Sequence, residues 1–274
     1  MRSQPRKLAA LMISGLLVTA CGSQPPAPVS DSSCGHQLSG APSEPKSGVR
    51  LTGVSQAADC AEVEITNSGN AAAVYTITIT SVGSSKEAQS GSQTMPAVGA
   101  GQTRKYSVVL GKLRPAAGNT MQVKISQVRS VPLAEAPSFG GTCPPSGARL
   151  YADPDPDAAM GLRDLGIHLE NCGKRPVHLT GYPQLELLDE DHKPVPEVKL
   201  LQASGPPHPL TLKPGERASA HLVWRNTTES DAALNLPYAR LRANPGTAPV
   251  MITPEFDLGT TGKLTLHPWK KDQP

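Results

Sequence analysis

The fold of this 274-residue chain is decided by the stretch Asp164-Leu165-Gly166-Ile167-His168-Leu169-Glu170-Asn171-Cys172-Gly173-Lys174. Apolar residues alternate with polar or small ones in its first part, so Leu165, Ile167 and Leu169 face one side. This period of two is typical of a strand with one buried face. Asn and Gly then supply turn chemistry. The stretch therefore predicts a strand that ends in a tight turn.

Similar short strands, separated by turn residues, recur along the whole chain. In the first half they are expected at 49–54, 61–66, 74–80, 104–110 and 121–128. In the second half they are expected at 164–170, 177–179, 185–187, 210–212, 217–225, 234–242, 250–253 and 263–267. No helical period lies between them, and the 28 prolines and 25 glycines disfavour long helices. An all-β fold built from β-sandwiches is predicted.

A segment rich in Pro, Ala, Ser and Gly at 132–141 indicates a linker between two domains, 34–131 and 142–270, with a short tail at 271–274. A weak internal repeat supports two similar domains. Ile65-Thr66-Asn67-Ser68-Gly69 parallels Leu169-Glu170-Asn171-Cys172-Gly173, and each is followed by a strand. Ala97-Val98-Gly99-Ala100-Gly101 likewise leads into a strand as Leu212-Lys213-Pro214-Gly215 does.

The first residues resemble a bacterial lipoprotein signal peptide. Basic residues precede a short apolar run at 8–17, which is the order of a secretory leader. The run is too short to span a membrane. Val18-Thr19-Ala20-Cys21 then resembles a lipobox, which implies cleavage of residues 1–20 and lipid on Cys21. An ordinary signal peptide is the alternative. Residues 21–33 have the composition of a flexible tether.

Four cysteines remain once Cys21 is assigned to lipid, and they allow three pairings. Export favours disulfides, and the simplest pairing joins Cys34 to Cys60 and Cys143 to Cys172. Free or metal-bound thiols are the alternative. Because no Cys-x-x-Cys spacing occurs, a zinc site is not expected.

The second half resembles a domain of unknown function that is common in actinobacterial secreted proteins and lipoproteins. The resemblance covers about half of the chain. It is carried by Leu169-Glu170-Asn171-Cys172-Gly173, by Val177-His178-Leu179-Thr180-Gly181-Tyr182-Pro183, by Leu212-Lys213-Pro214-Gly215-Glu216 and by Ala220-His221-Leu222-Val223-Trp224. It implies an immunoglobulin-like sandwich outside the cell, with no catalytic residues and no known ligand. The family often has a cysteine pair near its C-terminus, which this chain lacks. The fold expected is thus all-β, with two tandem immunoglobulin-like sandwiches.

Two groups of residues are candidate metal sites. Asp153-Pro154-Asp155-Pro156-Asp157 has the alternate carboxylates that begin a calcium loop, but Ala158 and Asp164 stand where that loop needs Gly and Glu. His168, His178 and His221 lie in predicted strands without a close pair at ligand spacing. We expect an acidic loop and ordinary histidines, and no metal or cofactor.

Aromatic residues form only 3% of the chain, so each is a candidate core anchor or ligand platform. Trp224 shares a face with Leu222 and Ala220 and is expected in the core. Tyr182 and Trp269 are the weak candidates for ligand binding: Tyr182 lies in a turn before Pro183, and Trp269 is expected to be half exposed.

The sequence contains no serine-hydrolase elbow, HExxH motif or phosphate loop, so no catalytic residues and no enzyme are predicted. The formal charge of +3 includes no basic block, which disfavours a nucleic-acid partner. The expected function is a non-catalytic interaction or envelope module, lipid-anchored on the outer face of the cytoplasmic membrane, with envelope protein or cell-wall material as partner. An accessory solute-binding or sensing lipoprotein and a hydrolase with a dispersed site are the alternatives.

Replacing Cys21 by Ser removes the only thiol that the lipobox pattern offers for lipid. Metabolic labelling with a fatty acid should mark the wild-type protein and be lost in Cys21→Ser. Equal labelling of the two proteins would rule the anchor out.

Overall fold

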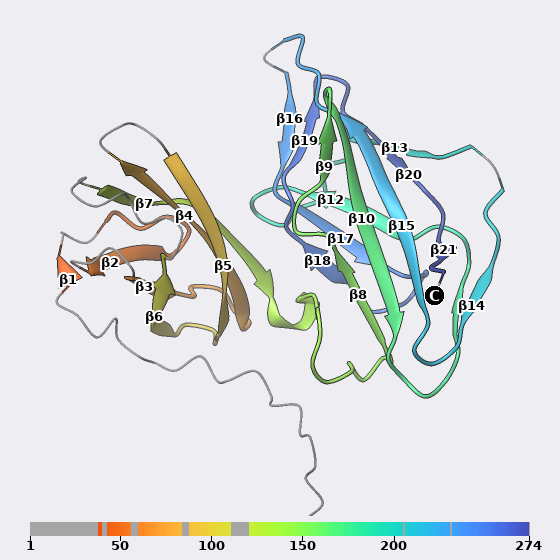
Figure 1. Ribbon diagram of the computed structural model, residues 1–274, viewed down its shortest axis with the longest axis horizontal. Helices are drawn as coiled ribbons and strands as arrows, with labels where there is room; N and C mark the ends of the chain where they lie inside the picture. The colour runs from red at the N-terminus through yellow and green to blue at the C-terminus, as the bar shows by residue number, and fades with distance from the viewer. Residues whose placement is uncertain are drawn as a thin grey trace, which may run out of the picture. The chain divides into compact units, whose positions relative to one another are not determined.

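The computed structural model describes residues 38–39, 43–55, 60–83, 88–110, 121–204, 206–230 and 232–273. In these ranges the protein is all-β, with several antiparallel sheets and no α-helix (Figure 1). No helix of this part of the chain has the length and hydropathy needed to cross a membrane. The predicted leader, Cys21, the tether at 21–33 and Cys34 lie outside the described residues.

The first half contains two sheets that share one core. One sheet has the order β1-β2-β3-β6, formed by Leu38–Ser39, Val49–Ser55, Cys60–Thr66 and Thr103–Val109. The other has the order β5-β4-β7, formed by Ala88–Val98, Ala73–Gly83 and Met121–Pro132. Alternate residues of both sheets, such as Val63 and Ile65 from β3 and Ile77 and Ile79 from β4, meet in a single buried cluster.

The second half is built around a larger sheet with the order β13-β20-β15-β10-β8, to which β9 and β21 add short pairings. Its strands are Lys199–Gln202 (β13), Lys263–Leu266 (β20), Arg217–Arg225 (β15), Leu162–Asn171 (β10), Ala148–Ala152 (β8), Asp157–Ala159 (β9) and Lys270–Lys271 (β21). Figure 1 shows β10 and β15 running side by side.

Three smaller sheets complete the second half. They are β11-β14 (Val177–Leu179 and Leu210–Leu212), β12-β17-β18 (Gln184–Leu188, Tyr238–Arg242 and Val250–Ile252) and β16-β19 (Leu234–Leu236 and Phe256–Gly259). The alternation predicted for β10 is confirmed: Leu165, Ile167 and Leu169 are buried in a core that also holds Trp224.

The strand β10 ends in a turn that is tied to the next sheet by one buried side chain. Asn171 is fully buried. Its Nδ2 donates to the carbonyl oxygens of Arg175 and Leu212, at 2.9 and 2.8 Å, and its Oδ1 accepts from the N–H of Gly173. One side chain therefore closes its own turn and joins it to β14. We call this arrangement the asparagine clamp.

The first half contains the same clamp at the end of β3. Asn67 is buried, and its Nδ2 donates to the carbonyl oxygens of Ala71 and Val98, at 2.8 and 2.9 Å. Its Oδ1 accepts from the N–H of Gly69. The partners stand at the same offsets in the turn as those of Asn171, and Val98 ends β5 as Leu212 ends β14.

The main chain of each clamp asparagine also makes the same two hydrogen bonds. In the second half its N–H donates to Glu216 and its carbonyl accepts from Gly215. In the first half the corresponding partners are Gln102 and Gly101. The weak sequence repeat around the two asparagines thus corresponds to one repeated structure.

A second repeat, which the sequence analysis missed, opens the first long strand of each half. Pro45-Lys46-Ser47-Gly48-Val49-Arg50-Leu51 matches Pro144-Pro145-Ser146-Gly147-Ala148-Arg149-Leu150. Gly48 and Gly147 have φ values of 76° and 77°, in the left-handed region that favours glycine. The following arginines form ion pairs with the neighbouring strand, Arg50 with Glu64 and Arg149 with Glu170.

Strands β1, β5, β8, β9, β13, β19 and β21 were not predicted, and the strand expected at 234–242 is divided into β16 and β17. For β5 the reason is chemical: residues 88–94 carry no apolar alternation, because its partner contacts are made by hydroxyl groups. Hydroxyl pairs join β4 to β5 at Thr76–Thr94, Thr78–Ser92 and Thr80–Ser90, at 2.8–3.0 Å. Such cross-strand pairs stabilise a sheet without the apolar period on which the prediction relied.

The predicted disulfide between Cys143 and Cys172 is confirmed, with a Cα–Cα distance of 5.6 Å. It ties the clamp turn of the second half to the segment before β8. Cys60 is also disulfide-bonded. Because Cys34 lies outside the described residues, its pairing with Cys60 stays a prediction.

Truncating either clamp leaves one buried carbonyl, one partly buried carbonyl and one N–H without their side-chain partner. Asn67→Ala and Asn171→Ala should each lower the free energy of unfolding by about 2–4 kcal/mol. Asn70→Ala, at an exposed position of the same turn, is the matched control and should change it by less than about 0.5 kcal/mol. Urea titration followed by circular dichroism measures the difference, and equal effects of Asn67→Ala and Asn70→Ala would contradict the clamp.

Candidate functional site

Trp269 is not the half-exposed residue that the sequence analysis expected. It is 3% exposed and belongs to the core of the second half. Its backbone N–H donates to Gly181 and its indole Nε1 donates to Ala243. The chain folds back after β20, which carries the ring inward, so the expectation of an exposed platform is wrong.

Tyr182 is partly buried against the same core, and its hydroxyl donates to the carbonyl of Ala203 at 3.0 Å. These contacts give the residue a structural role, and the stacking role expected for it stays untested. Trp224 is buried as predicted, and its Nε1 donates to Asp257.

The histidines of the predicted strands each contact a different partner. His168 and His221 contact Asp153 and Asp164, at 3.0 and 2.8 Å. His178 contacts the hydroxyl of Thr211. The described residues contain no group of three His, Cys, Asp or Glu side chains placed to hold a metal ion. Both histidine–carboxylate pairs are partly exposed, and neither residue of either pair lines either of the two cavities described below.

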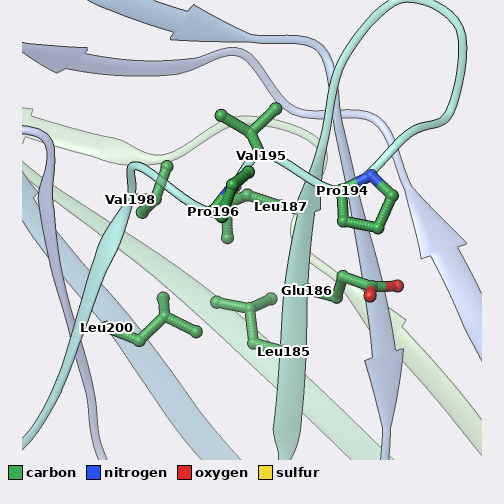
Figure 2. Close-up of a pocket in the computed structure, with 8 residues that line it drawn as sticks. All are labelled: Leu185, Glu186, Leu187, Pro194, Val195, Pro196, Val198 and Leu200. Carbon is green, nitrogen blue, oxygen red and sulfur yellow. The ribbon is translucent and has the colours of Figure 1, made fainter.

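An apolar groove lies between the edge strand β12 and the segment that leads to β13. Its volume is about 270 Å³. Figure 2 shows Leu185 and Leu200 facing each other across it, while the carboxylate of Glu186 points away. The remaining lining residues are Leu187, Pro194, Val195, Pro196 and Val198. All the lining side chains except that of Glu186 are aliphatic.

Strand β13 forms one side of this groove and is an edge strand among the described residues. It pairs in parallel with β20, and the N–H groups of Lys199 and Ala203 donate to the carbonyls of Gly262, just before β20, and Leu266, at its end. In a parallel ladder alternate residues bond to the same side. The main-chain groups of Leu200 and Gln202 therefore point away from β20.

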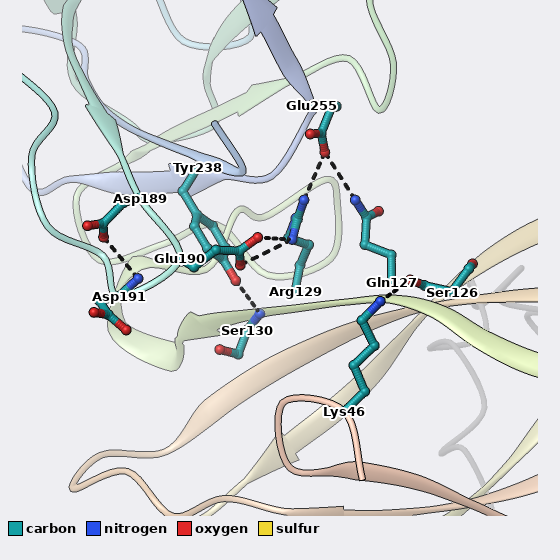
Figure 3. Close-up of polar contacts among 10 residues, drawn as sticks. All are labelled: Lys46, Ser126, Gln127, Arg129, Ser130, Asp189, Glu190, Asp191, Tyr238 and Glu255. Carbon is teal, nitrogen blue, oxygen red and sulfur yellow. Dashed lines mark hydrogen bonds and ion pairs between the residues drawn. The ribbon is translucent and has the colours of Figure 1, made fainter. Parts of the chain in front are cut away.

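Strand β7 carries an arginine that contacts the second half (Figure 3). The guanidinium of Arg129 is almost fully buried, lies 5.6 Å from the ring centre of Tyr238, and pairs with Glu190 and Glu255 at 3.1 and 2.8 Å. The N–H of Ser130 donates to the hydroxyl of Tyr238. Arg129 balances two carboxylates, which is the arrangement that a buried charge requires.

Residues 143–270 match the family described as "Domain of unknown function (DUF4232)". This match confirms the resemblance of the second half to a domain of unknown function. No curated protein matches the chain. The lipobox and the actinobacterial origin stay predictions.

Burial raises the pKa of both Tyr75 and Tyr238 above the ordinary value of 10.0. A raised pKa in the folded state means that stability is fully present below about pH 10 and is lost as pH rises through the folded-state value. We expect the free energy of unfolding to fall above about pH 10, and Tyr75→Phe to reduce that fall. Denaturant titrations between about pH 8 and pH 11 test this. A flat profile, or an unchanged slope in Tyr75→Phe, would contradict it.

Proposed function

We propose that this protein is a lipid-anchored, non-catalytic interaction module on the outer face of the cytoplasmic membrane. Its DUF4232 domain binds an extended segment of an envelope protein. The anchor rests on the leader and the Cys21 lipobox in the sequence. The confirmed disulfide of Cys143 and Cys172 supports an oxidising compartment.

The body of the module is proposed to be two tandem immunoglobulin-like sandwiches, 34–131 and 142–270, joined by the linker 132–141. Two observations support this architecture. Each half has its own buried core. The same asparagine clamp joins corresponding strands, β3 with β4, β5 and β6 in the first half and β10 with β11, β14 and β15 in the second.

The observation that carries the binding proposal is the edge strand β13 beside the apolar groove. An extended peptide can add to such an edge through main-chain hydrogen bonds, while pockets beside it select alternate side chains. Leu200 offers outward main-chain groups and also lines the groove. Apolar side chains at alternate positions of a bound peptide would lie against Leu185, Val198 and Leu200.

The alternatives have less support. A hydrolase needs acid, base and nucleophile groups that converge in a cavity. The groove has aliphatic side chains where those groups would be needed, and His168 and His221 face separate carboxylates elsewhere. A solute-binding role for the groove would also require several polar groups to fix the orientation of a small molecule.

Leu200 and Leu201 provide a matched pair for testing the groove. They are 44% and 46% exposed, adjacent on β13, and their side chains point to opposite faces of the strand. Leu200→Glu should abolish binding of peptides selected from a displayed library of extended peptides, because it puts a charge into the groove. Leu201→Glu should leave binding within about twofold of wild type.

The selection has a defined negative outcome. The expected enrichment is for apolar residues at alternate positions, and fluorescence anisotropy with the enriched peptides measures the affinity. The peptide-binding proposal would be contradicted by the absence of enrichment, or by an equal loss of affinity in Leu200→Glu and Leu201→Glu.

A further inference from the structure

A second cavity, also of about 270 Å³, lies beside the asparagine clamp of the first half. Residues 66–73 form one wall, including the whole clamp turn. Tyr75 and Ser130 line it from β4 and β7, and His192 lines it from the turn after β12. This volume is near the lower limit of small-molecule sites, roughly 300 Å³.

The lining of this cavity is polar but carries no carboxylate, ammonium or guanidinium group. Hydroxyl-bearing residues are Ser47, Thr66, Ser68, Ser130 and Tyr75, and Asn67 and Asn70 add amides. The nearby guanidinium of Arg129 is already paired with two glutamates. A charged ligand would lose its hydration here without a counter-charge, which is costly. A neutral ligand rich in hydroxyl groups would not pay this cost of an uncompensated charge.

Tyr75 supplies a hydroxyl at the cavity. The residue is buried and lines the cavity from β4. A buried or half-buried hydroxyl normally finds a partner. The partner that this position suits is a ligand atom able to donate or accept.

His192 is held in a conformation that few residues adopt. Its φ is 60°, in the left-handed region, where a non-glycine residue is strained. Asp189 Oδ1 stabilises the turn by accepting from the N–H groups of Asp191 and Lys193. The imidazole packs edge-on against Tyr238, with the ring centres 4.5 Å apart.

The Nε2 atom of His192 is buried and has no hydrogen-bond partner among the described residues. Leaving such a group without a partner is unfavourable. Because His192 lines the cavity, Nε2 is the atom of this residue that a ligand hydroxyl would pair with. Strain and an unpartnered nitrogen at the same residue are typical of a binding position.

We propose that this cavity binds a single neutral sugar unit, either a free monosaccharide or the terminal unit of a glycan, through Tyr75 and His192. The clamp of Asn67 holds the turn at the rim in place before binding, which lowers the entropic cost of association. This site is separate from the β13 groove, and neither proposal depends on the other.

The test is calorimetric titration of the full chain with neutral monosaccharides (glucose, galactose and N-acetylglucosamine) and with charged counterparts (glucuronate and glucosamine). At least one neutral sugar should bind saturably, and its charged counterpart should bind at least about tenfold more weakly. Tyr75→Phe and His192→Phe should each weaken binding by about five- to tenfold while keeping the rings. His178→Phe, at an exposed histidine of the second half, is the control and should leave the affinity for the neutral sugar unchanged.

Soluble glycan fragments that end in the same sugar distinguish the two sources. If the fragments compete with the monosaccharide for the site, the ligand is the terminal unit of a glycan. If they do not compete, the ligand is a free sugar. Thermal unfolding shows whether each variant is folded. If His192→Phe is not folded, the affinity of Tyr75→Phe alone decides the result. The proposal is overturned if no neutral sugar binds saturably, if charged sugars bind equally well, or if folded Tyr75→Phe keeps wild-type affinity.

Discussion

The structure depends on the buried side-chain amide of the two clamp asparagines. At the point where the chain leaves one sheet for another, this amide makes the hydrogen bonds that neighbouring strands make elsewhere. A strand that ends at a turn leaves carbonyl and N–H groups that need new partners. Asn171 satisfies three of them at once, two carbonyls and one N–H, from a fully buried position. No other side chain of this size offers two donors and an acceptor. The same requirement explains Asn67.

Both halves share the asparagine clamp, and they differ in the residues that surround the clamp turn. In the second half the clamp turn is closed by the disulfide of Cys172, and Gly173 lies against the backbone of Gly147. In the first half Ser68 stands in the place of Cys172, and the turn lines a cavity. The same clamp turn is thus fixed by a disulfide in the second half and lines a polar cavity in the first.

The all-β fold and most inner strands could be predicted because burial on one face imposes a period of two, as at Leu165, Ile167 and Leu169. Strand β5 could not, since its hydroxyl pairs with β4 leave no apolar period. The repeat that starts at Pro45 and Pro144 was readable from sequence, but only by comparing the two halves directly. Trp269 was misplaced because its burial depends on a long-range contact with Gly181.

The candidate sites were harder to predict than the fold for the same reason. The groove joins Leu185 to Leu200 across a proline-containing connection, and the leucine pair at 200–201 in a polar segment was its one local signal. The polar cavity joins the clamp turn to His192, more than a hundred residues away. A strained turn at Asp189 to Lys193 is visible in sequence only as polar hairpin chemistry. Its place is set by tertiary contacts, because His192 packs against Tyr238 and lines the same cavity as the clamp turn of the first half.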